Sequence, residues 1–558
     1  MGVRSVHPLR LGILLDASIQ QGWVVESVRQ CMKVPGVSLA AVAIARGIAR
    51  ESVASSLHRL FDRLDRRIRP RAEPLFDSAD VTAGLQAPLL QINADRCRDG
   101  WGPDAAGTCA LQQCDVDIWL CFTATAPRRP MRPVSRLGVW GIEIGQDVAA
   151  ASIWAGAMEL GAGSPVTMAS VVDYAASGDG LLYRSFGATV TNSARLNRLA
   201  ALRKAVSFFR RLLERCTLNA ENSLPAEVAA PAPAGYPALR EPTLPAIVRL
   251  SWRLTANVVG GRLHKLCWWQ QWQVAYYFAD DSEPSGRFEG LRYLVPPRDR
   301  FWADPYAVEH QGRYFIFLEE LPFDTQTGRI VVIEVFENGE PGEPQVALER
   351  PYHLSYPFLF DWDGVRYMMP ETGANRTVEV YRCEAFPQRW SRHRTVLENI
   401  NAYDATLYRD GDRWWMFVNV AEPGADSSDE LHLYSSTTPL GPWTAHRANP
   451  VVSDVRRARP AGPLFSRDGM LYRPSQDCSL AYGHSVLINR VDVLDDDAYR
   501  ETTVERVSPD WASNVLRIHT LGRSRRLRVI DCMVNRKHRL GGRSARYGRF
   551  TSRRITRA

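Results

Sequence analysis

The stretch FWADPYAVEHQGRYFIFLEE, residues 301–320, decides the fold of the second half of the chain. Two apolar and aromatic runs flank a short Gly-containing turn, which is the pattern of a β-hairpin. The same order of small or polar residue, Pro or Ala, strand, turn and strand recurs in LSYPFLFDWDGVRYMMPET (354–372), NAYDATLYRDGDRWWMFVN (401–419) and PAGPLFSRDGMLYRPSQD (460–477), and more weakly in WASNVLRIHTLGRSRRLRVID (511–531).

The spacing of these copies predicts the architecture. Pro305, Pro357, Ala405 and Pro463 mark the same place in four copies and are 52, 48 and 58 residues apart. A period near 50 residues with several strands per repeat is typical of β-propeller blades. The sequence therefore predicts an all-β five-bladed propeller, with the repeats over roughly 292–536 and the domain at 249–536. An all-β sandwich is the alternative, and the repeated turn-strand pattern argues against it.

The N-terminal part, residues 1–216, has a different pattern. Apolar runs of strand length alternate with segments of helical periodicity, which predicts an α/β domain with a mostly parallel sheet. The expected strands are RLGILLD (10–16), VSLAAVAIA (37–45) and CDVDIWLCF (114–122), and the expected helices are GWVVESVRQCMKV (22–34) and one long helix over 197–216.

A Pro- and Ala-rich linker is predicted at residues 217–248. Its most biased part, LPAEVAAPAPAGYPALREPTLP (224–245), is typical of a semi-rigid spacer that forms neither a helix nor a central strand. At the other end, residues 537–558 are predicted to be a basic, disordered tail. Thirteen Lys/Arg and one acid follow from Arg523 onward, so the net charge of +8 is a property of the tail and the remainder carries −4. Such a tail could contact an anionic membrane or nucleic acid.

Length and composition limit the possible domain count, localisation and metal content. With 558 residues, 45% hydrophobic and 23% charged, the chain is expected to form two or three soluble domains. No apolar run is long enough for a transmembrane segment. The apolar stretch 11–15 is too short for a secretory signal, so we expect a cytoplasmic protein. Ten cysteines are scattered without zinc spacing, which predicts reduced thiols and no metal site, and no cofactor is indicated.

The repeat register predicts where functional residues converge. In a propeller the innermost strands line a central channel, so the starts of these strands meet at one mouth. Carboxylates that accept from hydroxyls, together with aromatic faces, suit a sugar. The first tier is Asp304, Tyr356, Asp404 and Gly462. The second tier is Glu319, Glu371, Asn419 (or Val418) and Gln476, with Asp477 adjacent. Three aromatic residues are expected nearby: Trp302, Tyr403 and Trp414.

These residues carry a resemblance. ADP at 303–305, YDAT at 403–406 and AGP at 461–463 are similar to motifs of the arabinanase, xylosidase and invertase propellers. More closely, WADPYAV, SYPFLF, DATLY, RPSQD and IHTL resemble the propeller found N-terminal in glucosamine inositolphosphorylceramide transferases and in stand-alone bacterial relatives. The resemblance implies Asp304 as base or nucleophile and Asp404 as the residue that tunes the acid.

The same resemblance fails at the general acid. The glutamate of the EGP motif is replaced by Ala461, and glycoside hydrolysis ordinarily needs two carboxyl groups. Glu371 could substitute for it. The resemblance also suggests that His519, in the fifth repeat, holds a central ion or water.

The N-terminal part has a weaker resemblance to the formyltransferase fold. It rests on LGVWGIEIGQ (137–146) and SPVTMASVVDYAASGDGLLYRS (164–185). Gly141-Ile142-Glu143 stands where that family has Asn-x-His, and Ala176 stands at its catalytic Asp. The resemblance therefore implies a shared fold with a degenerate catalytic site.

Four hypotheses about function follow. The first is a carbohydrate-active or glycan-binding protein of surface polysaccharide or glycolipid biosynthesis, with a sugar or glycolipid bound in the propeller. The second is a glycosidase or glycosyl-transfer enzyme that uses Asp304 and Asp404 with Glu371. The third is an amino-sugar formyltransferase, and the fourth is a propeller that serves only as a protein-interaction platform. Whether the protein is an enzyme at all stays open at this point.

Overall fold

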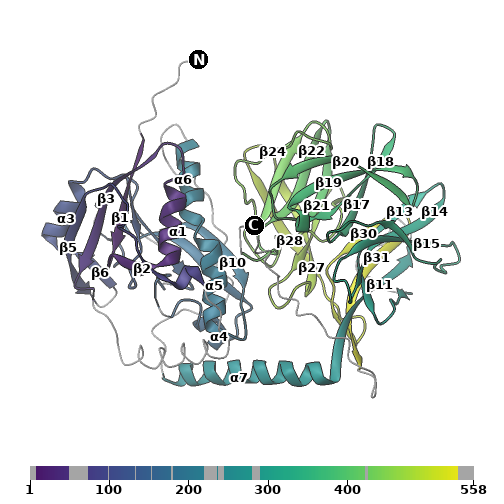
Figure 1. The fold of residues 1–558 in the computed structure, drawn as a ribbon, viewed down its shortest axis with the longest axis horizontal. Helices are drawn as coiled ribbons and strands as arrows, with labels where there is room; N and C mark the ends of the chain where they lie inside the picture. Colours follow the sequence, from purple (N-terminus) through teal and green to yellow (C-terminus); the bar gives the residue numbers. More distant parts are fainter. Residues whose placement is uncertain are drawn as a thin grey trace, which may run out of the picture. The chain divides into compact units, whose positions relative to one another are not determined.

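The computed structural model describes residues 8–48, 73–97, 100–131, 133–146, 148–152, 154–177, 180–218, 236, 244–279, 290–421 and 425–537. The chain divides into two compact units, residues 1–260 and 261–558 (Figure 1). Each unit is taken by itself below. Among the described residues, no helix is long and apolar enough to cross a membrane.

The first unit is built on an eight-stranded sheet in the order β10-β9-β8-β7-β1-β3-β5-β6. The five central strands, from β8 to β5, run parallel, while β9, β10 and β6 pair antiparallel. The expected α/β sheet is therefore mixed. The strands are β1 (Leu9–Leu15), β3 (Val37–Arg46), β5 (Leu89–Cys97), β6 (Gly100–Pro103), β7 (Ile118–Cys121), β8 (Val139–Ile144), β9 (Val166–Asp173) and β10 (Leu181–Ala188), with β2 (Ile19–Gln21) and β4 (Ser78–Asp80) paired separately.

Helices cover this sheet, and alternate residues of its strands pack on opposite sides. On β1, Leu11 and Ile13 belong to the core that includes Trp23 and Phe209, while Leu14 packs into the opposite core with Trp119. The elements are α1 (Gly22–Cys31), η1 (Pro74–Phe76), α3 (Ala105–Gln112), α4 (Met158–Ala162), α5 (Ala194–Ala205) and α6 (Phe208–Leu218). The single long helix expected over 197–216 is thus two helices, because the chain turns at Val206 and Ser207.

A 24-residue helix, α7 (Leu244–Cys267), crosses the predicted domain limits. It takes up the last residues of the linker expected at 217–248, so those residues are helical. It also takes up residues 249–267, which were expected to begin the propeller, and the first propeller strand starts at Trp268. Most of the linker lies outside the described residues. Tyr236 is described, and its hydroxyl donates to Glu159 Oε1 at 2.7 Å and accepts from the Met168 N–H at 2.8 Å.

The second unit is a five-bladed β-propeller, as the repeat predicts. Four blades are consecutive four-stranded antiparallel sheets. Their strands are β13–β16 (Arg300–His310, Arg313–Pro322, Arg329–Val335, Gln345–Leu348), β17–β20 (Ser355–Trp362, Val365–Thr372, Thr377–Ala385, Arg389–Glu398, with η2 at Gly373–Asn375), β21–β24 (Ala402–Asp410, Arg413–Val420, Leu431–Ser436, Thr444–Ala445) and β25–β28 (Phe465–Arg467, Met470–Asp477, Ser485–Leu494, Tyr499–Val507).

The fifth blade joins the two ends of the domain. Strand β11 (Trp268–Phe278), which precedes the first blade, pairs along its whole length with β31 (Leu527–Lys537). The strands β12 (Arg292–Leu294), β29 (Val515–Arg517) and β30 (Leu521–Arg523) complete this sheet. Because this sheet contains strands from both ends of the domain, the pairing closes the ring of blades. Because β31 ends at Lys537, the first residue of the expected basic tail is in a strand, and residues 538–558 lie outside the described residues.

One backbone feature recurs at the start of the inner strands. Asp304, Tyr356 and Asp404 each sit in a bulge where the register shifts, and each has a positive φ, of 51°, 44° and 54°. The equivalent residue of the fourth blade is Gly462, with φ of 129°, where an added Cβ would lie 1.9 Å from the Leu521 carbonyl oxygen. Left-handed backbone is costly for residues other than glycine and is often found at functional sites. The four residues of the first tier therefore share a positive φ at the start of the inner strand of their blades.

Candidate functional site

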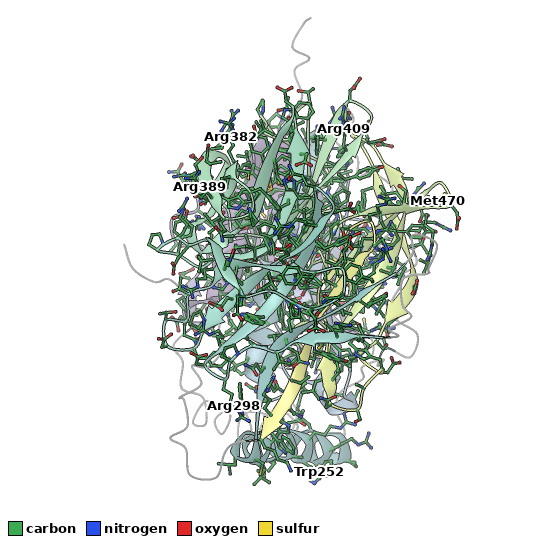
Figure 2. The ribbon with its side chains drawn as sticks, turned by 90° about the vertical axis from the view of Figure 1, so that its right-hand side faces the viewer. Trp252, Arg298, Arg382, Arg389, Arg409 and Met470 are labelled. Atoms are coloured by element: carbon green, nitrogen blue, oxygen red, sulfur yellow. The ribbon has the colours of Figure 1, made fainter. Side chains whose placement is uncertain are left out.

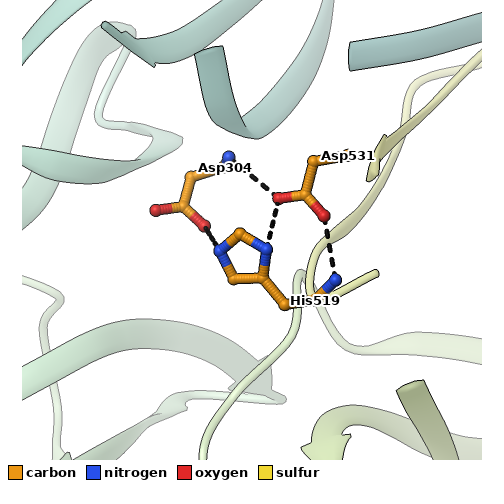
Figure 3. Close-up of side chains that lie close together, drawn as sticks. All are labelled: Asp304, His519 and Asp531. Carbon is orange, nitrogen blue, oxygen red and sulfur yellow. Dashed lines mark hydrogen bonds and ion pairs between the residues drawn. The ribbon is translucent and has the colours of Figure 1, made fainter. Parts of the chain in front are cut away.

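Asp304, at the first-blade bulge, meets the fifth blade (Figure 3). Its Oδ1 lies 3.0 Å from His519 Nε2 and accepts from the Thr520 hydroxyl at 2.8 Å. On the other side of the imidazole, His519 Nδ1 lies 2.8 Å from Asp531 Oδ2. Asp531 also accepts the backbone N–H groups of Asp304 and His519. One histidine thus stands between two buried carboxylates.

The electrostatics make this histidine a fixed cation. Burial alone would lower its pKa, but the charges of Asp531 and Asp304 raise the pKa of His519 to about 10. Burial would likewise raise the pKa of Asp304, but the charge of His519 and hydrogen bonds from His519 and Thr520 hold it below its usual value. The three residues are close enough to hold a metal ion. The imidazolium already supplies positive charge between the two carboxylates, and this charge opposes a bound cation.

Asp404, at the third-blade bulge, is held by a buried arginine. Arg459 Nε donates to Asp404 Oδ2 at 2.6 Å, and its Nη2 lies 3.3 Å from both Asp404 Oδ1 and Glu371 Oε2. Gln476 Nε2 donates to the same carboxylate at 3.0 Å. Arg459 therefore joins the third blade to the second, and Gln476 lies beside it as the register predicts.

Glu371 is the proton-bearing member of this group. Burial and the neighbouring charge of Asp404 raise its pKa well above the usual range, although Arg459 opposes the shift. It is also hydrogen-bonded to Asp404. Burial raises the pKa of Asp404 as well, but less far, because Arg459 opposes the shift, so a proton shared by the two carboxyl groups rests on Glu371. Glu371 can therefore donate a hydrogen bond or a proton where Asp404 can only accept.

Glu319, in the second tier, is a similar case. Burial and the charges of Asp304 and Glu371 raise its pKa well above the usual value. Its Oε1 lies 3.3 Å from His353 Nε2. His353 Nδ1 accepts the Gly328 N–H at 2.9 Å, so the ring proton is on Nε2 and faces Glu319. Burial lowers the pKa of His353, which keeps this ring neutral.

The predicted aromatic residues divide into two groups. Tyr403 lies at the site, with the Arg459 guanidinium 5.3 Å from its ring centroid. Trp302 and Trp414 do not lie beside the carboxylates: each is 7% exposed and packs in a core between blades. The Tyr356 hydroxyl bonds Thr406 at 2.8 Å and accepts the Gly462 N–H at 2.8 Å, so this tyrosine braces the bulges.

Two further predicted residues have structural partners. Asp477 is buried, and its carboxylate pairs with Arg506 at 2.7 Å and caps the following loop at the Ser479 N–H. Asn419 is also buried; its amide binds the Ser427 carbonyl and the Glu430 N–H. Both therefore hold loops of their own blades.

Three residues of the site escape the sequence analysis: Arg459, Tyr482 and Asp531. Tyr482 is 39% exposed and stands over the site, with its ring 5.0 Å from the Arg459 guanidinium and 5.3 Å from the His519 ring. Arg459 lies only two residues before the AGP segment. Its proximity to a conspicuous motif was the one available signal. Ala461, at the position of the missing acid, is completely buried.

In the first unit, Glu143 on β8 forms an ion pair with Arg129, whose guanidinium lies 5.2 Å from the Tyr174 ring centroid. Glu143 is thus a buried, neutralised carboxylate. The later Gly178-Asp179 of the sequence pattern lies outside the described residues. The formyltransferase-like identity of this unit stays a prediction.

The C-terminal unit is thus a five-bladed propeller in which strands and connecting loops bring five carboxyl groups and two cations together. Residues 296–521 match the model of the family described as "Glucosamine inositolphosphorylceramide transferase 1, N-terminal". The region is 34% identical over 208 residues to glucosamine inositolphosphorylceramide transferase 1 of Oryza sativa subsp. japonica and 32% identical over 207 residues to that of Arabidopsis thaliana. Each alignment covers 37% of this chain but only 28% and 27% of those proteins.

Solved structures are also similar to this chain. A family 117 glycoside hydrolase, Zg3597 of Zobellia galactanivorans, aligns over 47% of this chain and 90% of its own, with 13% identity and a TM-score of 0.31. A thermostable family-43 glycoside hydrolase aligns over 38% and 77%, with 13% identity and a TM-score of 0.29. We draw no conclusion about activity from likenesses at this level.

Proposed function

We propose that the propeller binds a carbohydrate at the carboxylate cluster, as part of surface polysaccharide or glycolipid biosynthesis. The observation that carries this proposal is the buried group of Glu371 and Asp404 around Arg459, in which the raised pKa of Glu371 favours a proton donor beside acceptor and cationic groups. Sugar hydroxyls both donate and accept, so they need a site with both kinds of partner. The matching family takes its name from a glucosamine inositolphosphorylceramide transferase, which supports a carbohydrate ligand.

The geometry of the cluster supports a ligand at its outer edge. Glu371, Glu319 and Arg459 are each nearly buried but retain a small exposed fraction. The Arg459 guanidinium lies 5.3 Å from the Tyr403 ring centroid and 5.0 Å from the Tyr482 ring centroid, so two aromatic rings border it. An aromatic face beside charged hydrogen-bonding groups suits the apolar face and hydroxyl rim of a pyranose ring.

The test is binding of glycans, sugar nucleotides and glycolipids by the full chain. Asp304→Asn and Asp404→Asn remove charge-assisted hydrogen bonds worth about 1.5–3 kcal/mol, so affinity should fall by about one to two orders of magnitude. Tyr482→Ala removes a partly exposed ring without unpairing a buried charge and should also weaken binding. Asp361→Asn, at an exposed surface pair with Arg366, is the matched control. Retained affinity in all three site variants would exclude the sugar site.

A second candidate is cleavage or transfer of a glycosidic bond. Its support is that the pKa of Asp304 is held low while the pKa of Glu371 is raised, the division of roles expected of a base and an acid. Glu371 would protonate the leaving oxygen, and Asp304 would accept the proton of the attacking water or hydroxyl. Glu371→Gln separates the two functions: it keeps the donor and should preserve binding, but it abolishes any turnover. Wild-type protein that binds a glycoside and never cleaves or transfers it would leave binding as the function.

For the first unit we propose a degenerate formyltransferase-like domain without formyl transfer. The buried Glu143–Arg129 pair stands where an Asn-x-His pair would be needed, and its charges are already neutralised. Formylation of an amino sugar from formyl-tetrahydrofolate, above a buffer blank and abolished by Glu143→Gln, would contradict this proposal.

For the propeller, failure of all glycans to bind would favour the hypothesis that it serves as a protein-interaction platform.

A further inference from the structure

A pocket of about 570 Å³, partly open to solvent, lies between the fourth and fifth blades of the propeller. The residues that line it come from β25–β28 and the segment just before β25 in the fourth blade, and from β11, β30 and β31 in the fifth. It is therefore contained within the second unit. Protein interiors are closely packed, so a gap of this size between two blades is unusual and falls in the range of ligand pockets.

The floor of the pocket is apolar. Ile488 and Val507 of the fourth blade are 1% and 5% exposed, and Ile530 of the fifth blade is 1% exposed. These three side chains belong to one core cluster that joins the two blades. Pro474, which pairs with Ile488 across strands, adds a ring to the lining. The part of a ligand that enters this floor must therefore be an alkyl chain or a ring.

The rim of the pocket carries positive charge. Arg523 on β30 lies directly opposite Arg528 on β31, and Arg528 lies opposite Tyr277 on β11. Directly opposite residues of an antiparallel pair point to the same side of the sheet, and all three line the pocket. Like charges at opposite positions repel each other. An anionic group between the two arginines lowers that cost.

Contacts within the protein position both cations at the rim. The Arg523 guanidinium lies 5.2 Å from the Phe465 ring centroid, which is a cation–π distance and links the fifth blade to the fourth. Arg528 Nη1 donates to the Ser524 and Arg525 carbonyl oxygens at 2.6 and 3.2 Å. Arginine stays charged in proteins. A carboxylate or phosphate group at this rim can therefore accept charge-assisted hydrogen bonds.

We propose that this pocket binds a small amphiphilic anion, with an alkyl chain or ring on the apolar floor and one carboxylate or phosphate group at Arg523 and Arg528. The site is separate from the carboxylate cluster. Successive residues of a strand point to opposite sides, so Ile530 faces the pocket while the next residue, Asp531, faces His519. The propeller thus has a second binding site that does not depend on the proposed sugar site.

The test is calorimetric titration of the full chain with four ligands that share an eight-carbon chain: octanoate, octyl phosphate, octanol and octylammonium. The wild type should bind each anion at one site, and octylammonium at least about tenfold more weakly because the arginines repel it. Tighter binding of octyl phosphate than of octanoate would assign a phosphate head group to the natural ligand, and the reverse order would assign a carboxylate. Inorganic phosphate should not compete, since it leaves the floor empty.

Two variants separate the head group from the chain. Arg523→Gln should lower the affinity for both anions by about tenfold and leave octanol binding unchanged. Val507→Thr places a hydroxyl on the floor at nearly constant shape and should weaken all eight-carbon ligands by about threefold or more. The matched controls, Arg382→Gln and Val346→Thr, alter exposed residues of other blades and should bind as the wild type does; Arg382 is labelled on the propeller in Figure 2.

Equal affinity of the wild type and Arg523→Gln for octanoate would overturn the proposal. Failure of octanoate to saturate the wild type, or competition by inorganic phosphate as strong as that by octyl phosphate, would do the same. Tyr482→Ala, at the carboxylate cluster, should bind octanoate as the wild type does. A loss of octanoate binding in that variant would place the ligand at the cluster and contradict a separate site.

Discussion

Replacing Glu371 by glutamine should change how the stability of the propeller depends on pH. The folded pKa of Glu371 is raised well above the value of 4.5 expected in an unfolded chain, through burial and the charge of Asp404. A raised folded pKa contributes stability that is fully present below the unfolded pKa and is lost as pH rises toward the folded pKa. Glutamine resembles the protonated carboxyl in shape but has no proton to lose, so the variant should escape this loss.

The size of the effect follows from proton linkage. While Glu371 stays protonated in the fold and is ionised in the unfolded chain, each pH unit costs the wild type about 1.4 kcal/mol of unfolding free energy. As pH rises above about 4.5, the stability of Glu371→Gln should therefore increase relative to that of the wild type, by up to about 1.4 kcal/mol for each pH unit over which folded Glu371 keeps its proton. The control Glu398→Gln, at an exposed position on β20, should run parallel to the wild type.

The assay is urea unfolding of the full chain at a series of pH values, together with infrared spectra of the folded protein. The wild-type spectrum should contain the band of a protonated carboxyl that is reduced in Glu371→Gln at neutral pH. Parallel stability curves for the wild type and Glu371→Gln, with no change in that band, would show that Glu371 is ionised. The donor role assigned to it would then be wrong.

Three further changes test the same architecture. Arg459→Met should destabilise the propeller by about 3–5 kcal/mol because it leaves Asp404 as an unpaired buried charge. Arg459→Lys should recover only part of this stability, since lysine cannot make both contacts. The melting temperatures of the two variants measure both effects. The stability of the wild type should fall as pH rises from about 7 toward the His519 pKa of about 10, by up to about 1.4 kcal/mol per pH unit, whereas His519→Gln should give a flatter pH dependence in urea titrations. Gly462→Ala should cost about 3 kcal/mol or more because its Cβ meets the Leu521 carbonyl oxygen at 1.9 Å, while Gly411→Ala, with a positive φ but open space, should cost about 1 kcal/mol.

The propeller could be predicted from the sequence because its signal is repeated. Each copy contributes the same hairpin, so the register of one blade fixes that of the next, and the bulges at Asp304, Tyr356 and Asp404 fall where the register places them. The closure of the ring could not be read in the same way. Strand β11 precedes the first repeat and has no copy of the motif, and its partner β31 lies more than 200 residues away in sequence.

The candidate site was predicted only in part, for a related reason. A repeat register aligns positions on strands, so it found the carboxyl groups of Asp304, Asp404 and Glu371. Arg459 and Tyr482 lie in connections between strands, where the register has no equivalent position. The register also shows which residues are close in sequence, but it does not show in which direction their side chains point. Trp302 precedes Asp304 by two residues, yet its indole points into the core between blades and donates to Glu320.

The charge balance of the cluster determines whether a substitution removes a charge or a proton donor. Five carboxyl groups, of Asp304, Asp404, Glu319, Glu371 and Asp531, face two cations, His519 and Arg459. Full ionisation would leave an excess of three buried negative charges, which is costly in a medium of low polarity. The site therefore retains protons. Burial raises the pKa of Asp404 too, but the pKa values of Glu319 and Glu371 are raised well above their usual value, so the two glutamates hold protons most readily. Amide substitution of a glutamate preserves the native hydrogen-bonding state, whereas amide substitution of Asp304 or Asp404 unpairs a cation. A ligand that is lost in the aspartate variants but kept in the glutamate-to-glutamine variants is thus held by the charges and by donor groups that glutamine preserves.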